Sequence, residues 1–135
     1  MYSVKANAVS KNSALIKVKE SEFNFGITPS TNDQLASPAE LFLGSVAACI
    51  LKNVERFSVL MKFKYESASI EVTAVRLEKP PRMDEITYSL KVYSDDSKLN
   101  TELLQRNVEK FGTIYNTVKQ SCKIEGTIQK LAPQF

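Results

Sequence analysis

Ser37-Pro38-Ala39-Glu40-Leu41-Phe42-Leu43-Gly44-Ser45-Val46-Ala47-Ala48-Cys49 is the stretch of sequence that decides the fold. Its first four residues predict a helix start, because Ser caps free backbone N–H groups, Pro fits the first turn and Glu stands three residues after the cap. The residues that follow are apolar or small on every side of a helix, and charged residues return only from Lys52. We therefore expect a central helix that is buried on all its faces.

Short segments of alternating polarity precede this helix. Residues 2–9 and 14–19 alternate in the manner of strands, and residues 22–27 form a third short segment after a polar break. The sequence therefore predicts a three-stranded meander before the central helix.

A second pair of strands follows the helix. Residues 67–77 and 85–93 return to a period of two, and Pro80-Pro81 separates them as a hairpin connection. The side chains expected on the inward faces are Ile70, Val72, Ala74, Ile86, Tyr88, Leu90 and Val92.

The last third of the chain predicts one more helix and one more strand. Apolar residues in steps of four and three indicate an amphipathic helix that runs through Gly112, and one further step of four reaches Cys122. The stripe consists of Leu104, Val108, Phe111, Tyr115 and Val118. With residues 124–131 as a final strand, the pattern is that of a single α+β domain over residues 1–135, in which sheets cover the helices.

Composition narrows the classes of partner. The chain has 135 residues, of which 43% are hydrophobic and 24% charged, as in one globular domain. Its 18 basic and 15 acidic residues are interspersed, so we expect no nucleic-acid partner. The N-terminus does not resemble a secretory signal and no apolar stretch is long enough to span a bilayer, so we expect a cytoplasmic protein without a membrane partner.

The chemistry available to the chain is limited by the absence of histidine. Cys-His and Ser-His nucleophile pairs are excluded, and we expect neither a metal nor a bound cofactor. The two cysteines, Cys49 and Cys122, lie 73 positions apart (122 minus 49), which is neither a CxxC motif nor a metal-ligand spacing. A cysteine in an Ala-rich helix is by default a small core residue, so joint action requires that the fold bring the two thiols together.

The quoted helix resembles that of the OsmC/Ohr family, in which an Asn/Ser-Pro cap leads through small and apolar residues to Ala-Cys or Gly-Cys. The second thiol, in Ser121-Cys122-Lys123-Ile124, falls where the family places its other cysteine, and the order of elements agrees. The resemblance implies an OsmC-like fold with antiparallel sheets wrapped around two central helices in an intertwined homodimer.

The same resemblance implies a thiol-dependent reductase of organic hydroperoxides that acts in oxidative stress defence. Cys49 would attack the peroxide and become a sulfenic acid, Cys122 would resolve it to a disulfide, and an external dithiol would restore both thiols.

The chain departs from the arginine-bearing members of the family. Their acidic residue directly after the cap proline is replaced by Ala39, and the acid stands one position later at Glu40. Their early arginine is missing, since the first arginine is Arg56, and Lys11 is the nearest basic substitute. The Val-Ser ending usual after the second cysteine is also absent. The pattern resembles a less characterised OsmC-like branch.

These departures bear on how Cys49 would be activated. An ordinary cysteine has a pKa of about 8.5, and lowering it to about 6 requires roughly 3.4 kcal/mol of stabilisation of the anion. The helix dipole fades within the first turn, so a cation must approach from Lys11, Arg56 or Arg82. We expect weaker peroxidase activity than in arginine-bearing relatives, because lysine lacks the arginine fork.

Two interpretations stay open for other parts of the site. Glu40 is either a capping-box residue or a catalytic acid. A second function, from a different class, is noncatalytic binding of a hydrophobic small molecule in a cavity at the dimer interface. Tyr88, Tyr93 and Tyr115 fit core or interface positions, and any of them would also suit the lining of a peroxide pocket.

Overall fold

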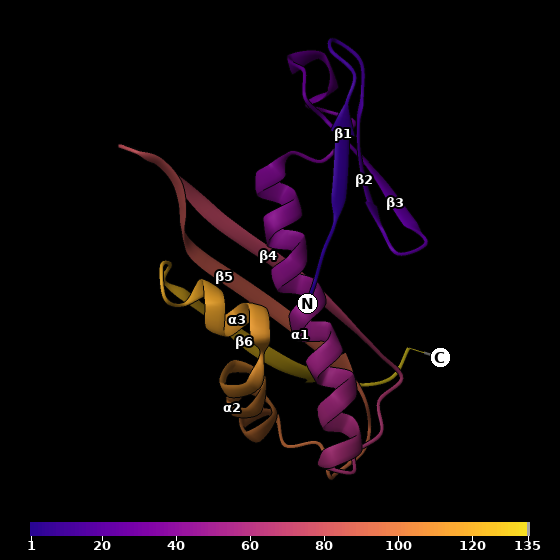
Figure 1. Ribbon diagram of the computed structural model, residues 1–135. Helices are drawn as coiled ribbons and strands as arrows, with labels where there is room; N and C mark the ends of the chain where they lie inside the picture. The colour runs from indigo at the N-terminus through magenta and orange to yellow at the C-terminus, as the bar shows by residue number, and fades with distance from the viewer. Residues whose placement is uncertain (135) are drawn as a thin grey trace. The chain divides into compact units, whose positions relative to one another are not determined.

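The computed structural model describes residues 1–134. They divide into two compact units, one of residues 1–42 and one that begins at residue 43, and helix α1 (Pro38–Leu60) continues from the first into the second. Strands and helices follow one another in the predicted order, so the α+β class is confirmed (Figure 1). The single domain over residues 1–135 stays a prediction.

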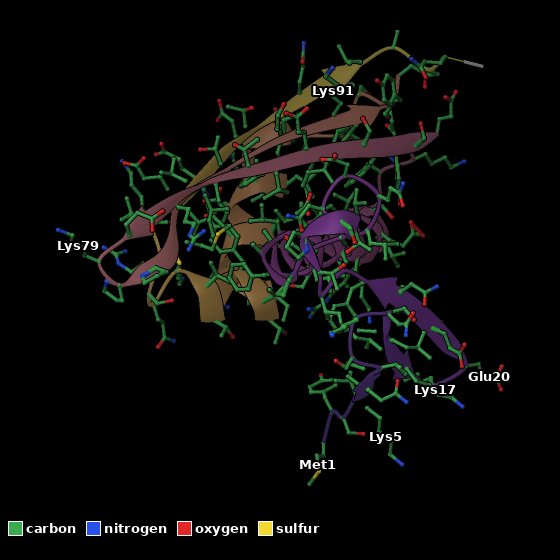
Figure 2. The ribbon with its side chains drawn as sticks, turned by 90° about the horizontal axis from the view of Figure 1, so that it is seen from above. Met1, Lys5, Lys17, Glu20, Lys79 and Lys91 are labelled. Atoms are coloured by element: carbon green, nitrogen blue, oxygen red, sulfur yellow. The ribbon has the colours of Figure 1, made fainter. Side chains whose placement is uncertain are left out.

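The first unit is a small antiparallel sheet. Strands β1 (Lys5–Ala8), β2 (Ala14–Val18) and β3 (Ser21–Phe25) pair in the order β1-β2-β3, which confirms the predicted meander. Lys5 and Lys17 are directly opposite each other in this sheet (Figure 2). Every residue of β1 is exposed, so the sheet buries little apolar surface within its own unit. A single turn of 3-10 helix, η1 (Pro29–Thr31), leads on towards α1.

Helix α1 begins with the predicted capping box. The backbone N–H of Glu40 donates to Ser37 Oγ at 3.3 Å, and the backbone N–H of Ser37 donates to Glu40 Oε1 at 3.0 Å. These two bonds satisfy N–H groups that the first turn of a helix leaves free.

The prediction that α1 is buried on all its faces is wrong for the single chain. Its buried residues form one stripe of Val46, Ile50, Asn53, Val54, Phe57 and Ser58. Gly44 and Ala48 are exposed. Small residues allow a helix to pack closely on several sides. Within the single chain, however, only one side of α1 contacts the core of the second unit.

The second unit is built on a mixed sheet. Strands β4 (Ser67–Glu78) and β5 (Pro81–Tyr93) form the predicted antiparallel hairpin, with Lys79 near its tip (Figure 2). Strand β6 (Ile124–Leu131) pairs with β5 in parallel, whereas the expected sheets were antiparallel. Parallel pairing follows from the helical crossover between the two strands, which returns the chain to the same edge before β6 begins.

The amphipathic stripe after β5 folds as two helices. Helix α2 (Thr101–Phe111) begins at Asn100, whose side chain accepts a hydrogen bond from the backbone N–H of Leu103, and helix α3 (Thr113–Val118) follows. The predicted continuous helix is therefore wrong at Gly112, where the backbone is extended with φ −71° and ψ 117°.

The core of the second unit lies between the sheet and its helices. Alternate residues of β5 are buried as predicted, at Ile86, Tyr88, Leu90 and Val92. They share one cluster with buried residues of α1, α2 and α3, while the predicted inward residues of β4 are partly buried against it. Lys91, on the other face of β5, points away from the helices (Figure 2). The three helices thus cover one face of this sheet.

Candidate functional site

Cys49 lies in the middle of α1 as a free, half-buried thiol. A Cβ atom added at Gly112 would stand 3.3 Å from Cys49 Sγ, 3.1 Å from Tyr115 Cβ and 2.8 Å from the carbonyl oxygen of Val108. The sulfur therefore packs against the junction of α2 and α3. Any side chain at Gly112 would press on the thiol and on the end of α2.

The polar neighbour of Cys49 within its own helix is Asn53. Its amide Nδ2 donates to the carbonyl oxygen of Cys49 at 2.9 Å and to Cys49 Sγ at 3.7 Å. Neither Asn53 nor Gly112 was identified from the sequence as part of the site. The sequence feature that could have indicated Asn53 is a polar residue four positions after Cys49, on the apolar stripe of the helix.

Cys122 follows α3 by one turn and is also free and half-buried. Its backbone N–H donates to the carbonyl oxygen of Val118 at 2.9 Å. Its sulfur donates to the carbonyl oxygen of Met83 at 3.4 Å. The hydroxyl Oγ of Ser121 lies 3.8 Å from the same sulfur.

Asp84 fixes the chain next to Cys122. Its Oδ1 accepts from the backbone N–H of Lys123 at 2.9 Å and from that of Glu85 at 2.8 Å, and its Oδ2 accepts from Arg82 Nη1 at 3.0 Å. The Lys123 N–H, followed by that of Glu85 and by Arg82, lowers the pKa of Asp84 to about 2. The carboxylate thus anchors the start of β6 in its ionised form.

A buried polar network supports the same sheet from the helical side. Tyr88, 1% exposed, donates its hydroxyl to Glu109 Oε2 at 2.6 Å. Gln105 Nε2 donates to the Tyr88 hydroxyl at 3.1 Å and to the carbonyl oxygen of Gly126 at 2.7 Å. Burial and then the Glu109 carboxylate raise the pKa of Tyr88 well above its ordinary value. The phenol therefore stays a hydrogen-bond donor, and α2 is tied to β5 and β6.

Tyr115 connects the surroundings of the two thiols. Its Cβ borders Gly112, and its hydroxyl donates to the carbonyl oxygen of Ile124 at 3.3 Å. Its ring meets the Tyr88 ring edge-on with centroids 6.4 Å apart. Burial and the Glu109 carboxylate raise its pKa to about 12. The segment 112–122 thus begins beside the sulfur of Cys49 and ends at Cys122.

The two arginines considered for Cys49 are engaged elsewhere. Arg56 lies over the ring of Phe57, 5.4 Å from its centroid, and Arg82 pairs with Asp84 at 3.0 Å. Across residues 43–134, no lysine or arginine donates a hydrogen bond to either sulfur. Lys11 belongs to the first unit, where it is exposed in the β1–β2 turn with φ 64°. Its role beside Cys49 stays a prediction.

Glu40 acts as a helix cap in the structure. The backbone N–H of Ser37, and then its side chain, holds the pKa of Glu40 below its ordinary value. The capping interpretation is confirmed, while a catalytic role for this carboxylate stays a prediction. Within residues 1–134, no three Cys, Asp or Glu side chains are gathered as a metal site would need. None of the helices described combines the length and the apolar character that crossing a bilayer requires.

The OsmC-like protein family matches residues 31–126, a span that contains both cysteines, and the chain therefore belongs to that family. A search of curated protein sequences finds no match.

Solved structures of the family share the fold. An OsmC-like protein from Mycoplasma pneumoniae is similar with a TM-score of 0.86 at 17% identity, covering 97% of each chain. An OsmC-like protein of unknown function from Vibrio cholerae has a TM-score of 0.78 at 12% identity, covering 95% of this chain and 99% of its own. An organic hydroperoxide resistance protein OsmC from Legionella pneumophila has a TM-score of 0.66 at 14% identity, covering 96% and 98%.

Proposed function

We propose that the protein reduces organic hydroperoxides, with Cys49 as the peroxidatic and Cys122 as the resolving thiol. The observation that carries this proposal is the placement of two free, half-buried thiols at the two ends of the segment 112–122. Solved relatives from Legionella pneumophila and Bacillus subtilis that are named for organic hydroperoxide resistance support the same assignment. The free thiols also suit the cytoplasm, where cysteines are kept reduced.

The proposed reaction has three steps: oxidation of Cys49, formation of a disulfide, and reduction of that disulfide. The Cys49 thiolate attacks the outer peroxide oxygen, the O–O bond breaks, and with one proton the products are the Cys49 sulfenic acid and an alcohol. The Cys122 thiol then displaces water from the sulfenic acid and forms a disulfide with Cys49. An external dithiol reduces that disulfide and leaves as its own disulfide, which returns both cysteines to thiols.

We propose further that the protein works as a homodimer. The first unit exposes large apolar side chains, including Val4 at 64%, Val9 at 62% and Phe23 at 50%. A three-stranded sheet with so little cover is marginal on its own, and a second copy of the chain would bury it. Light scattering coupled to size exclusion tests this point, and a monomer at micromolar concentration would exclude it.

The test of the function is a stoichiometric oxidation followed by intact-mass measurement. With tert-butyl hydroperoxide, the unsubstituted protein should lose two hydrogens as a Cys49–Cys122 disulfide forms, and an added dithiol should reverse the change. The Cys122→Ser variant should stop at a sulfenic acid on Cys49 that dimedone traps. The Cys49→Ser variant should remain unmodified.

Unreacted thiols in the unsubstituted protein would contradict peroxide reduction. They would favour the second function instead, in which the protein binds a hydrophobic small molecule between subunits without chemistry. Turnover with a dithiol should be slower than in arginine-bearing relatives, because no guanidinium in residues 43–134 bonds to Cys49.

A further inference from the structure

The side-chain amide of Asn53 has an orientation that its contacts determine. The atom 2.9 Å from the carbonyl oxygen of Cys49 must be the nitrogen, because two oxygens would repel each other at that distance. An amide nitrogen carries two hydrogens. Since the same nitrogen lies 3.7 Å from Cys49 Sγ, its second hydrogen is available to the sulfur.

The side chain of Asn53 is buried. Asn53 is 8% exposed, and it lies on the same buried stripe of α1 as Ile50 and Val54. Asparagine is an ordinary-to-poor helix former, and a buried amide costs stability unless it is hydrogen-bonded. An apolar residue at position 53 would extend the core. The chain has an amide there instead, and the hydrogen bonds of this amide go to Cys49.

Four charged side chains on the helices around Cys49 make contacts that do not involve its sulfur. On α1, Glu55 accepts from the hydroxyl of Tyr65 and Arg56 lies over a phenylalanine ring. On α2, the Lys110 ammonium lies 5.3 Å from the ring centroid of Phe111, and Glu109 accepts from the Tyr88 hydroxyl at 2.6 Å. Lys52 is exposed three residues after Cys49 and makes no hydrogen bond to it.

We propose that Asn53 stabilises the thiolate of Cys49 by donating an amide hydrogen bond to the sulfur, in the role that a cation has in arginine-bearing members of the family. The proposal deepens the proposed function by naming the group that prepares its nucleophile. A neutral amide supplies less stabilisation than a guanidinium, but its hydrogen bond gains strength because Asn53 is itself buried.

The experiment measures iodoacetamide labelling of both cysteines by peptide mass spectrometry, so that Cys122 is an internal reference in every sample. The rate ratio of Cys49 to Cys122 is taken at about pH 7, where an ordinary thiol is mostly protonated, and at about pH 10, where it is mostly ionised. In Asn53→Ala we expect a fall of about tenfold at the lower pH and no change at the higher pH. Asn53→Asp should fall further, since a carboxylate repels the sulfur anion.

Two variants are matched controls. Asn107→Ala removes another amide that contacts sulfur, 3.6 Å from Met61 Sδ, and should leave the ratio unchanged. Lys52→Met removes the ammonium nearest in sequence and should also leave it unchanged. A ratio unaffected in Asn53→Ala, a fall that is equal at both pH values, or a comparable fall in Lys52→Met would each overturn the proposal.

A measurement on the unsubstituted protein does not depend on how any variant folds. The side-chain amide protons of Asn53 should shift in NMR spectra as Cys49 ionises, and resonances that stay constant through that ionisation would overturn the proposal. The labelling experiment contains no peroxide. If the Asn53 effect is present while peroxide leaves both thiols unreacted, the amide role stands and the proposed function fails.

Discussion

Cys49 and Cys122 are both free and half-buried, yet their sulfurs have different polar neighbours. The sulfur of Cys49 accepts from the amide of Asn53, whereas the sulfur of Cys122 donates to the carbonyl oxygen of Met83. An amide donor can bond to a sulfur anion, whereas a carbonyl oxygen can bond only to the proton of a thiol. Two chemically identical side chains of one chain thus have different hydrogen-bonding environments: an amide donor beside Cys49, and a carbonyl acceptor with a neighbouring hydroxyl beside Cys122.

The two thiols nevertheless rest on one scaffold, and the largest expected effect comes from removing it. In Gly126→Ala the new Cβ would lie 2.3 to 2.5 Å from ring atoms of Tyr88, whose side chain is fully buried. We expect a loss of about 3 kcal/mol in the free energy of unfolding, measured by urea denaturation. Labelling of both cysteines should rise together.

Gly44→Ala is the matched control for this change. A Cβ at Gly44 meets nothing within 4 Å, and the residue is exposed within a helix. This variant should be stabilised by about 0.5–1 kcal/mol. If Gly126→Ala and Gly44→Ala were equally stable, the Tyr88 ring would have moved aside at little cost. The idea that both thiols depend on its packing would then be wrong.

Gly112→Ala should affect Cys49 more than Cys122. Its Cβ would meet the Val108 carbonyl oxygen at 2.8 Å and the Cys49 sulfur at 3.3 Å, and the backbone oxygen cannot move without disturbing α2. We expect a loss of about 1–2 kcal/mol together with altered iodoacetamide labelling of Cys49. Labelling of Cys122 should change less, and a larger change at Cys122 would contradict the assigned packing.

Tyr115→Phe tests the link between the two surroundings with a smaller change. The variant loses the hydroxyl that donates to Ile124 at 3.3 Å, a long bond that we expect to contribute about 0.5–1 kcal/mol. Amide hydrogen exchange at the start of β6 should become faster, while the Cys49 helix is unaffected. Unchanged exchange in β6 would mean that this hydroxyl does not hold the Cys122 end.

Asp84→Asn should have the smallest effect at neutral pH and a distinct effect in acid. The pKa of Asp84 is about 2 in the folded chain and about 3.9 in the unfolded chain. Its carboxylate therefore stabilises the fold at pH values above about 3.9, and this contribution is lost as the pH falls towards 2. Thermal unfolding between about pH 5 and pH 2 should show a steeper loss of Tm in the unsubstituted protein than in Asp84→Asn. Parallel curves would contradict the anchoring of Lys123 by this carboxylate.

Features set by neighbours in sequence were predictable. The capping box at Ser37 and Glu40 is local chemistry, and the alternation along β5 reflects one buried face. The break at Gly112 was not predictable, because the apolar stripe continues in phase from Val108 to Tyr115 on both sides of it. The extended backbone there serves a close approach to Cys49 that only tertiary packing defines.

The candidate site was predictable in its thiols and not in their partners. Cys49 and Cys122 were identified from their positions in a family pattern, whereas the acceptor for Cys122 is a backbone carbonyl, which every residue carries. Asn53 escaped notice because an asparagine on a helix usually faces solvent. The parallel pairing of β6 escaped for a similar reason, since strand periodicity does not encode the direction of the neighbouring strand.

The contacts that hold Cys122 have a consequence for the order of assembly. Its bond to Met83 and the adjacent bond from Lys123 to Asp84 each join residues 39 positions apart, across the whole α2–α3 crossover. Such distant pairings form late, after the intervening helices have folded onto the sheet. During synthesis, Cys49 therefore emerges and can enter its helix well before Cys122 reaches the carbonyl oxygen of Met83.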